Sequence, residues 1–266
     1  MAQRGRQNGQ QQPLGPGAPV KKASQQSWRN GYAAGSRFAA AWRRRLYFLT
    51  LTKGVFMSQT KMESKAGMQP RHGQVFKPES RGQLCVDGVN AQCPLQSWHV
   101  NGLESGKFFP AAVAGLMDPL APTDTPNAAP PADGKIASAG QAHSAVLDEQ
   151  SAERWAKHPA KSGQEMEFQW SYHARHLTRR WNYFITKADW NPNQPLSRAQ
   201  FESEPFYKVE MSAQPYWEHS AELMPPEPTI HMMRMPQRQG YHVVLAVWEV
   251  ADTGNAFYQV IDFDFS

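Results

Sequence analysis

The histidines are the residues of this 266-residue chain best suited to hold a transition metal. Taken singly, each is better explained as an ordinary surface or hydrogen-bonded residue. His173 and His176 stand out because they lie three positions apart in the string Tyr-His-Ala-Arg-His. In a regular strand this spacing points the two side chains to opposite faces, so both can bind one ion only at a bend. A metal site there also needs a ligand from elsewhere in the chain, which spacing alone does not identify.

The two cysteines, Cys85 and Cys93, are separated by seven residues that include the turn pair Asp87-Gly88. A turn at this pair lets the thiols face one another and close a short loop. Two cysteines are too few for a zinc-finger pattern. The sequence therefore favours a disulfide, which implies an oxidising compartment; in the cytosol the same pair would stay reduced.

Charge divides the chain into two parts. Residues 1–71 hold 13 of the 28 Lys and Arg residues and a single acid, Glu63, whereas 72–266 carry more acids than bases. We expect residues 1–71 to be a basic, disordered leader and residues 72–266 to be one globular domain. The leader is a poor match to a secretory signal, so it is either a processed segment or the product of a mis-assigned start, with Met57 as a second candidate. No base-reading motif accompanies its arginines, so no specific nucleic-acid partner is expected.

Apolar periodicity predicts several strands after residue 72. Residues 165–172 are apolar at every second position, which is the period of a half-buried strand. Residues 241–250 are almost continuously apolar, which suits a strand buried on both faces. Two further β-rich runs cover residues 181–186 and 257–265.

Few other regions look regular. Only residues 147–157 and 197–201 have a helical pattern, and five prolines predict an irregular loop over residues 116–134. No apolar run reaches the roughly 20 residues needed to cross a bilayer, so no membrane-spanning segment is expected. Strands separated by polar turns, with short helices and one long loop insertion, predict a mostly β, antiparallel β-sandwich.

Long strings in this part of the chain resemble a known family. They read DGKIASA, LDEQSAERW, ARHLTRRWNYFITKADWNPNQPLSRAQF and GYHVVLAVWEVADTGNAFYQVIDFDF, and the string HGQVFKPESRGQLC begins at His72. They closely resemble the bacterial lytic polysaccharide monooxygenases of the chitin-binding type-4 family, whose mature chains begin with histidine. The resemblance runs from His72 to Ser266 and implies an immunoglobulin-like or fibronectin-III-like sandwich.

The resemblance implies a copper site known as a histidine brace. His72 matches the histidine that binds copper through its α-amino group and its imidazole, and His176 matches the second histidine. Phe257 and Ala174 match the residues that cover the two axial positions, and Glu104 matches the acidic residue beside the copper. Three nitrogen ligands suit Cu(II), which prefers tetragonal nitrogen sites. An external electron donor, with oxygen or hydrogen peroxide as co-substrate, completes what the family implies.

The resemblance also implies a flat polar surface that contacts crystalline polysaccharide. Trp98 matches an aromatic stacking position, and its polar neighbours in QSWHVN favour exposure. Asp252 and Asn255 match further contact positions. His99 and His173 stand where the family commonly has an acid and a small hydroxyl residue.

These matches predict copper-dependent oxidative cleavage of a β-1,4-linked polysaccharide, most readily crystalline chitin at C1, by a secreted monomer. The sequence does not separate chitin from cellulose. A non-catalytic chitin-binding protein or adhesin that uses the same surface is the alternative from a different class.

Two departures from the family pattern bear on this reading. Tyr207 and Met233 stand about where the family usually has a second disulfide. His72 is internal in the sequence as written, so the full chain is expected to be inactive, and the competent form is expected to begin at His72.

Overall fold

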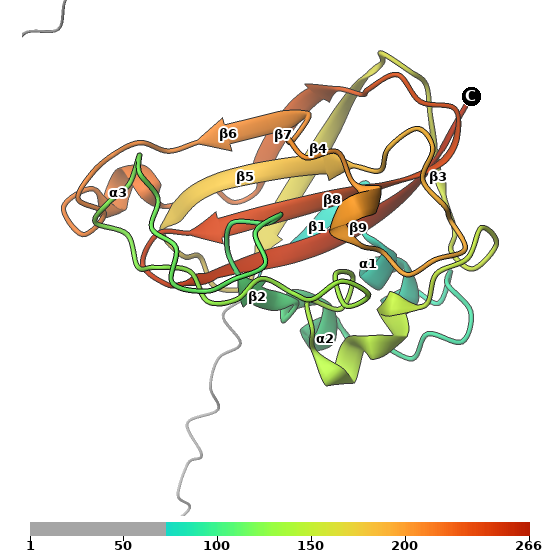
Figure 1. The fold of residues 1–266 in the computed structure, drawn as a ribbon, viewed down its shortest axis with the longest axis horizontal. Coiled ribbons are helices and arrows are strands. Elements are labelled where there is room, and N and C mark those ends of the chain that lie inside the picture. Colours follow the sequence, from blue (N-terminus) through green and yellow to red (C-terminus); the bar gives the residue numbers. More distant parts are fainter. Residues whose placement is uncertain (1–72) are drawn as a thin grey trace, which may run out of the picture. The chain divides into compact units, whose positions relative to one another are not determined.

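The computed structural model describes residues 73–266, which form two β-sheets and several short helices (Figure 1). The smaller sheet has the strand order β1-β4-β7 and is antiparallel throughout. The larger sheet has the order β2-β9-β8-β5-β6, and the short strand β3 pairs parallel to β9. The strands are β1 Gly73–Lys77, β2 Glu104–Gly106, β3 His158–Ala160, β4 Glu165–Tyr172, β5 Thr178–Ile185, β6 Tyr207–Glu210, β7 Thr229–Arg234, β8 Gly240–Val250 and β9 Asn255–Phe265.

The two sheets enclose one core and the larger sheet covers a second. Buried side chains of β1, β4 and β7, such as Val75, Phe168 and Met233, meet those of β5, β8 and β9 between the sheets. On the opposite face of the larger sheet, Leu245 and Val247 pack against residues of the helices and loops. Apolar groups therefore cover both faces of β8, which explains its almost continuous apolar sequence. The predicted mostly β sandwich and its four predicted strand regions are confirmed.

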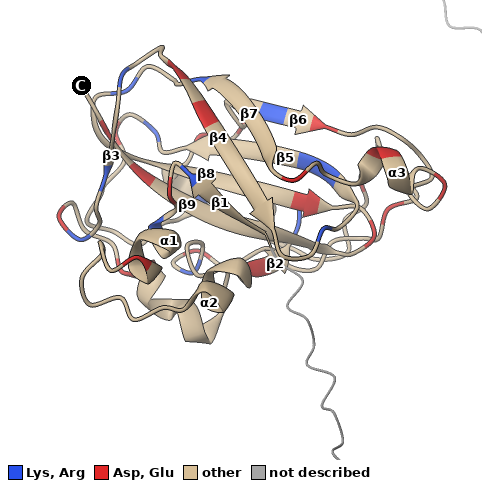
Figure 2. Cartoon of the chain, turned by 180° about the vertical axis from the view of Figure 1, so that it is seen from behind, with Lys and Arg blue, Asp and Glu red and all other residues tan. Residues whose placement is uncertain are grey.

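The outer face of the smaller sheet carries polar side chains on β4 and the exposed apolar side chains Ile230 and Met232 on β7. Lys77 on β1 forms an ion pair of 2.8 Å with Glu167 on β4, a strand whose acidic positions are visible in Figure 2. The alternation of β4 thus separates a buried face with Phe168 and Trp170 from a face that contacts water.

The helices are short and lie among the loops. They are α1 Arg81–Val86, α2 Ser97–Asn101 and α3 Ser220–Leu223, with 3₁₀ helices η1 Ala142–Asp148 and η2 Arg198–Gln200. The expected helix at residues 197–201 is present as η2. No helix within residues 73–266 is long and apolar enough to cross a membrane.

The predicted helix over residues 147–157 is wrong. Helical structure there ends with η1 at Asp148, and the next residues form turns. Their hydrogen bonds go to distant parts of the chain: Ala152 N–H donates to Asn193 Oδ1 and Arg154 donates to the carbonyl of Ala91. Trp155 is buried, with 2% exposure, and its indole N–H donates a hydrogen bond to the carbonyl of Glu149. These tertiary contacts outweigh the helical preference of the segment.

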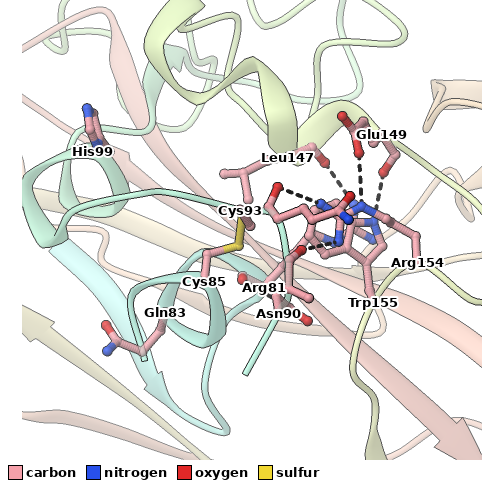
Figure 3. The surroundings of a disulfide bond; sticks show 12 residues. Arg81, Gln83, Cys85, Asn90, Cys93, His99, Leu147, Glu149, Arg154 and Trp155 are labelled. Carbon is pink, nitrogen blue, oxygen red and sulfur yellow. Dashed lines mark hydrogen bonds and ion pairs between the residues drawn. A yellow bond between two sulfur atoms is a disulfide. The ribbon is translucent and has the colours of Figure 1, made fainter. Parts of the chain in front are cut away.

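The predicted disulfide is confirmed. Cys85 at the end of α1 is bonded to Cys93, and the Cα atoms are 5.2 Å apart (Figure 3). Gly88 adopts a φ of 74° in the turn between them, a conformation that suits glycine. Beside the bond, Arg81 is buried and holds Asp262 at 2.6 Å, which fixes α1 onto β9.

The predicted irregular loop is also confirmed, since residues 116–134 contain no helix or strand. Asn127 anchors it through side-chain hydrogen bonds to Leu116 N–H and to the carbonyls of Lys107 and Val113. Buried Asp124 binds Arg179 on β5 at 2.7 Å. The loop is therefore held firmly against the larger sheet.

Candidate metal centre and its surrounding surface

His176 lies just after a bend in the chain between β4 and β5. The bend is at His173 and Ala174. A bend is what the three-residue spacing of His173 and His176 requires if both are to bind one ion. The imidazole of His176 is about nine-tenths buried, at 10% exposure, and its Nδ1 is 4.0 Å from Asp252 Oδ1. His173, by contrast, is exposed. The structure therefore separates the two histidines, one directed into the surface and one toward solvent.

Trp248 connects His176 to the beginning of β1. The ring centroids of His176 and Trp248 are 5.9 Å apart. A Cβ added to Gly73 would lie 2.8 Å from Trp248 Cζ3 and 2.7 Å from Tyr172 Cδ1, so the backbone approaches these rings as closely as only glycine permits. His72, the residue before Gly73, lies outside the described residues. Between residues 73 and 266 there is no cluster of three metal-binding side chains.

Phe257 and Ala174 both lie near His176. Phe257 is fully buried, and its ring centroid is 5.8 Å from that of His176 and 4.9 Å from that of Trp248. Ala174 is half-buried in the bend that precedes His176. Both residues thus lie close to His176, and their axial roles toward a metal stay predictions.

Glu104 and Asn255 meet where β2 pairs with β9. Asn255 Nδ2 donates to Glu104 Oε1 at 2.8 Å, and Glu104 lies opposite Phe257 in the ladder. Gln141 donates to the backbone carbonyl of Glu104 at 2.6 Å. Glu104 is therefore held on β2, directly across the ladder from Phe257, whose ring lies next to His176.

Asp252 belongs to the turn between β8 and β9. Its backbone carbonyl accepts a hydrogen bond of 3.1 Å from Thr125 Oγ1 in the long loop. Below this turn, buried Lys107 donates to the carbonyl of Val250 at 2.8 Å. Burial lowers the pKa of Lys107 to about 8, against the opposing attraction of Asp124 and Glu249. The turn that carries Asp252 is thus fixed from both sides.

Trp98 and His99 lie on α2, which precedes β2 in the chain. Trp98 is exposed at 50%, as its polar neighbours predict. Its ring centroid is 3.7 Å from that of His99 and 5.3 Å from that of His143 on η1. Sequence reasoning missed His143, because only the contact of η1 with α2 brings it to the indole and no local pattern encodes that contact.

The positions where the family usually has a second disulfide are filled by apolar packing. Met233 on β7 is 2% exposed, and Tyr207 on β6 packs against the same core between the sheets. His231, also on β7, has its ring centroid 6.0 Å from that of Tyr207. Aromatic contacts therefore connect β6 to β7 at this place.

Comparison with known proteins places this arrangement in a family. The family model described as lytic polysaccharide mono-oxygenase, cellulose-degrading, matches residues 72–263. GlcNAc-binding protein A of Shewanella oneidensis is 40% identical over 196 residues, which are 73% of this chain and 36% of that protein. The chain thus spans about a third of the length of this curated relative.

Solved structures agree with this placement. A chitin binding domain from Burkholderia pseudomallei is 48% identical, with a TM-score of 0.71, over 74% of this chain and 100% of that chain. A Bacillus amyloliquefaciens protein solved in complex with Cu(I) is 35% identical, with a TM-score of 0.55, over 73% of this chain and 100% of that chain. The match of the family model over most of the chain and the shared sandwich identify the chain as a member of the lytic polysaccharide monooxygenase family.

Proposed function

We propose that this protein, once its chain begins at His72, cleaves crystalline chitin by copper-dependent oxidation at C1 of the glycosidic linkage. The observation that carries the proposal is the convergence on Trp248. This one indole contacts His176 and also limits the space at Gly73, the residue next to His72 in the sequence. Two segments far apart in the chain are therefore directed to the same place.

The donor set of this place fits copper. The imidazole of His176 is one nitrogen ligand, and the α-amino group and imidazole of His72 would be the other two. Cu(II) prefers nitrogen donors in a tetragonal arrangement. Among first-row divalent ions, Cu(II) binds such sites most tightly. When bound, copper supplies one-electron chemistry with oxygen or hydrogen peroxide after reduction by an external electron donor.

The residues around His176 have separate tasks in this proposal. Phe257 would help to exclude water from the metal that His176 would hold, because its ring is fully buried near that imidazole. Asp252 and Glu104 place carboxylates next to the site, and Asn255 holds the carboxylate of Glu104. Trp98 presents an exposed indole on which a sugar ring can stack.

Chitin is preferred as the substrate because relatives carry names that refer to it. The Shewanella relative is named for GlcNAc binding and the Burkholderia structure for chitin binding. Cellulose is the competing lattice, since the matching family model is described as cellulose-degrading. Secretion belongs to the same proposal, because crystalline chitin is extracellular, and we propose a monomeric state as well.

A non-catalytic chitin-binding protein is the second candidate, and the same two names favour it. The variant His176→Ala separates the candidates, because it removes a copper ligand and leaves Trp98 and Asn255 in place. Chains that begin at His72, with and without this substitution, would be loaded with copper and incubated with β-chitin and ascorbate. We expect oxidised oligosaccharides from the unsubstituted chain alone and chitin binding by both.

Mass spectrometry of the soluble products decides the outcome. Products oxidised at C1 support the proposal, and parallel incubation with cellulose assigns the polymer. Binding without any oxidised product in the unsubstituted chain would favour the non-catalytic candidate. Equal product yield from both chains would show that His176 does not hold the metal.

A further inference from the structure

Three aromatic rings form a compact group where η1 contacts α2, and we call this group the three-ring patch. It consists of Trp98, His99 and His143. The centroid of His99 is 3.7 Å from that of Trp98 and 5.1 Å from that of His143, with the two imidazoles stacked at 29°. Trp98 and His143 are exposed, and α2 carries none of the Lys, Arg, Asp or Glu residues coloured in Figure 2. The patch therefore presents rings rather than charges.

Hydrogen bonds through Gln96 fix two of the rings. His99 Nδ1 accepts from the backbone N–H of Gln96 at 2.9 Å. The Gln96 side-chain oxygen accepts from Trp98 Nε1 at 2.6 Å. Because Nδ1 accepts, the neutral imidazole carries its proton on Nε2. Protonation of His99 would put a hydrogen on Nδ1 and remove this acceptor at the N-terminus of α2, where backbone N–H groups have no partner within the helix.

The charge of His99 depends mainly on its place in the patch. Partial burial lowers the pKa of His99, and repulsion by His143 lowers it further. The other charged groups on α1, β1, η1 and the start of β2, which surround α2, are held by partners of their own. These pairs are Arg81 with Asp262, Lys77 with Glu167, Asp148 with Lys135, and Glu104 with Asn255.

We propose that His143 and His99 extend Trp98 into a single binding surface for a neutral sugar unit, and that this surface weakens when the imidazole of His99 is protonated. The C–H groups of a sugar carry partial positive charge and are attracted by the negative face of a neutral ring. An imidazolium reverses that attraction. In this arrangement His143 contacts the sugar, and His99 is a positioning residue that holds Gln96 and the indole.

The inference rests on the proposed function only for the choice of a sugar as the ligand. A chitin-binding assay without copper tests it. The full chain would be mixed with β-chitin in EDTA at pH 8 and pH 5, and the free protein measured. We expect His143→Ala to bind about threefold to tenfold more weakly at pH 8, the effect of about 0.5–1.5 kcal/mol typical of one aromatic contact. The unsubstituted chain should bind more weakly at pH 5 than at pH 8.

Two conservative variants separate contact from titration. His143→Phe keeps an aromatic ring at this position, so it should bind as the unsubstituted chain does at pH 8. His99→Asn keeps an oxygen acceptor for Gln96 N–H and should reduce the loss at pH 5. His158→Ala is the matched control, because His158 lies on β3 and hydrogen-bonds to the carbonyl of Glu79.

The outcomes distinguish this inference from the function on which its ligand rests. If the unsubstituted chain binds chitin equally at both pH values, or if His143→Ala binds as tightly as the unsubstituted chain, the three-ring patch is not the contact surface. The polysaccharide function then still stands. If the unsubstituted chain binds neither chitin nor cellulose at either pH, the polysaccharide function itself is contradicted.

Discussion

Trp248 is the single residue on which the candidate metal centre depends most. It is fully buried, its ring centroid is 4.9 Å from that of Phe257, and its indole N–H donates to Thr178 Oγ1 at 2.7 Å. Since it also limits the space at Gly73 and contacts His176, it fixes where two segments meet. A residue of this kind sets the geometry of a metal site without being a ligand.

The variant Trp248→Phe tests that role. Loss of the Thr178 hydrogen bond and of part of the ring should weaken copper binding by about tenfold, as is usual for partners of metal ligands. Copper affinity would be measured by competition titration on chains that begin at His72. Trp155→Phe is the control, because Trp155 is equally buried in the other core. Equal copper affinity in both variants would show that Trp248 does not position the site.

His231 should make stability depend on pH. Its Nδ1 accepts from the Tyr183 hydroxyl at 2.7 Å, and burial lowers its pKa to about 4. The unfolded chain takes up a proton near pH 6.5 and the folded chain resists it until about pH 4, so stability is lost as pH falls through this window. We expect a loss on the order of 2 kcal/mol from this residue.

Urea unfolding of chain 72–266 at pH 7 and pH 4.5 measures this effect. His231→Phe should be less stable at pH 7, because Tyr183 loses a partner, yet it should lose less stability between the two pH values. Part of the dependence should remain, because burial also lowers the pKa of His242 to about 4. An unchanged difference between the two pH values in the variant would contradict the assignment.

At the scale of elements, strand β2 and the long loop together support the surface around His176. Gly106 N–H donates to the carbonyl of Ala129 at 3.0 Å, and Ala128 N–H donates to the carbonyl of Gly254 at 2.8 Å. A Cβ at Gly106 would overlap the backbone of Ala128. Close approach of two backbones at this place therefore requires glycine.

Gly106→Ala should push the loop away from β2 and disturb both the turn that carries Asp252 and the start of β9 at Asn255. We expect a destabilisation of about 1–3 kcal/mol, as for other overpacked sites, together with weaker chitin binding. Gly115→Ala, at the residue just before the loop, is the matched control: its φ is 81° and nothing lies within 4 Å of the added Cβ, so it should cost only backbone strain. Similar chitin affinity for both variants would show that the loop does not shape the surface.

The strands could be predicted from sequence because their apolar patterns reflect burial directly. The alternation at Glu165–Tyr172 and the continuous run at Tyr241–Val250 correspond to one covered face of β4 and two covered faces of β8. The helical pattern at 147–157 failed because Ala152 N–H and the Arg154 side chain bond to distant residues, which hold this segment in turns. Short elements such as α2 leave no periodic signal, since five residues make little more than one helical turn.

The site was predictable only in part. The resemblance proposed His176, Phe257, Glu104 and Asn255, and the structure brings these residues together, while their roles stay predictions. Neither the role of Trp248 nor the position of His143 follows from spacing, because each depends on contacts between segments far apart in the chain. His72 lies outside the described residues, so its part in the site stays a prediction.

At the scale of the whole molecule, the peptide bond before His72 decides whether the proposed site can be complete. A free α-amine has a pKa of about 7.7–8.0 and offers a lone pair after it loses a proton. In the chain as written, that nitrogen belongs to the Arg71–His72 peptide bond, where resonance delocalises the lone pair. The full chain would therefore supply two imidazoles and lack the third nitrogen.

One comparison tests this account most directly: the full 266-residue chain against a chain that begins at His72, both loaded with copper and incubated with β-chitin and ascorbate. Mass spectrometry would detect oligosaccharides oxidised at C1. We predict such products from the chain that begins at His72, none from the full chain, and none after His176→Ala. Oxidised products from the full chain with its N-terminus intact, or none from the chain that begins at His72, would contradict the central claim.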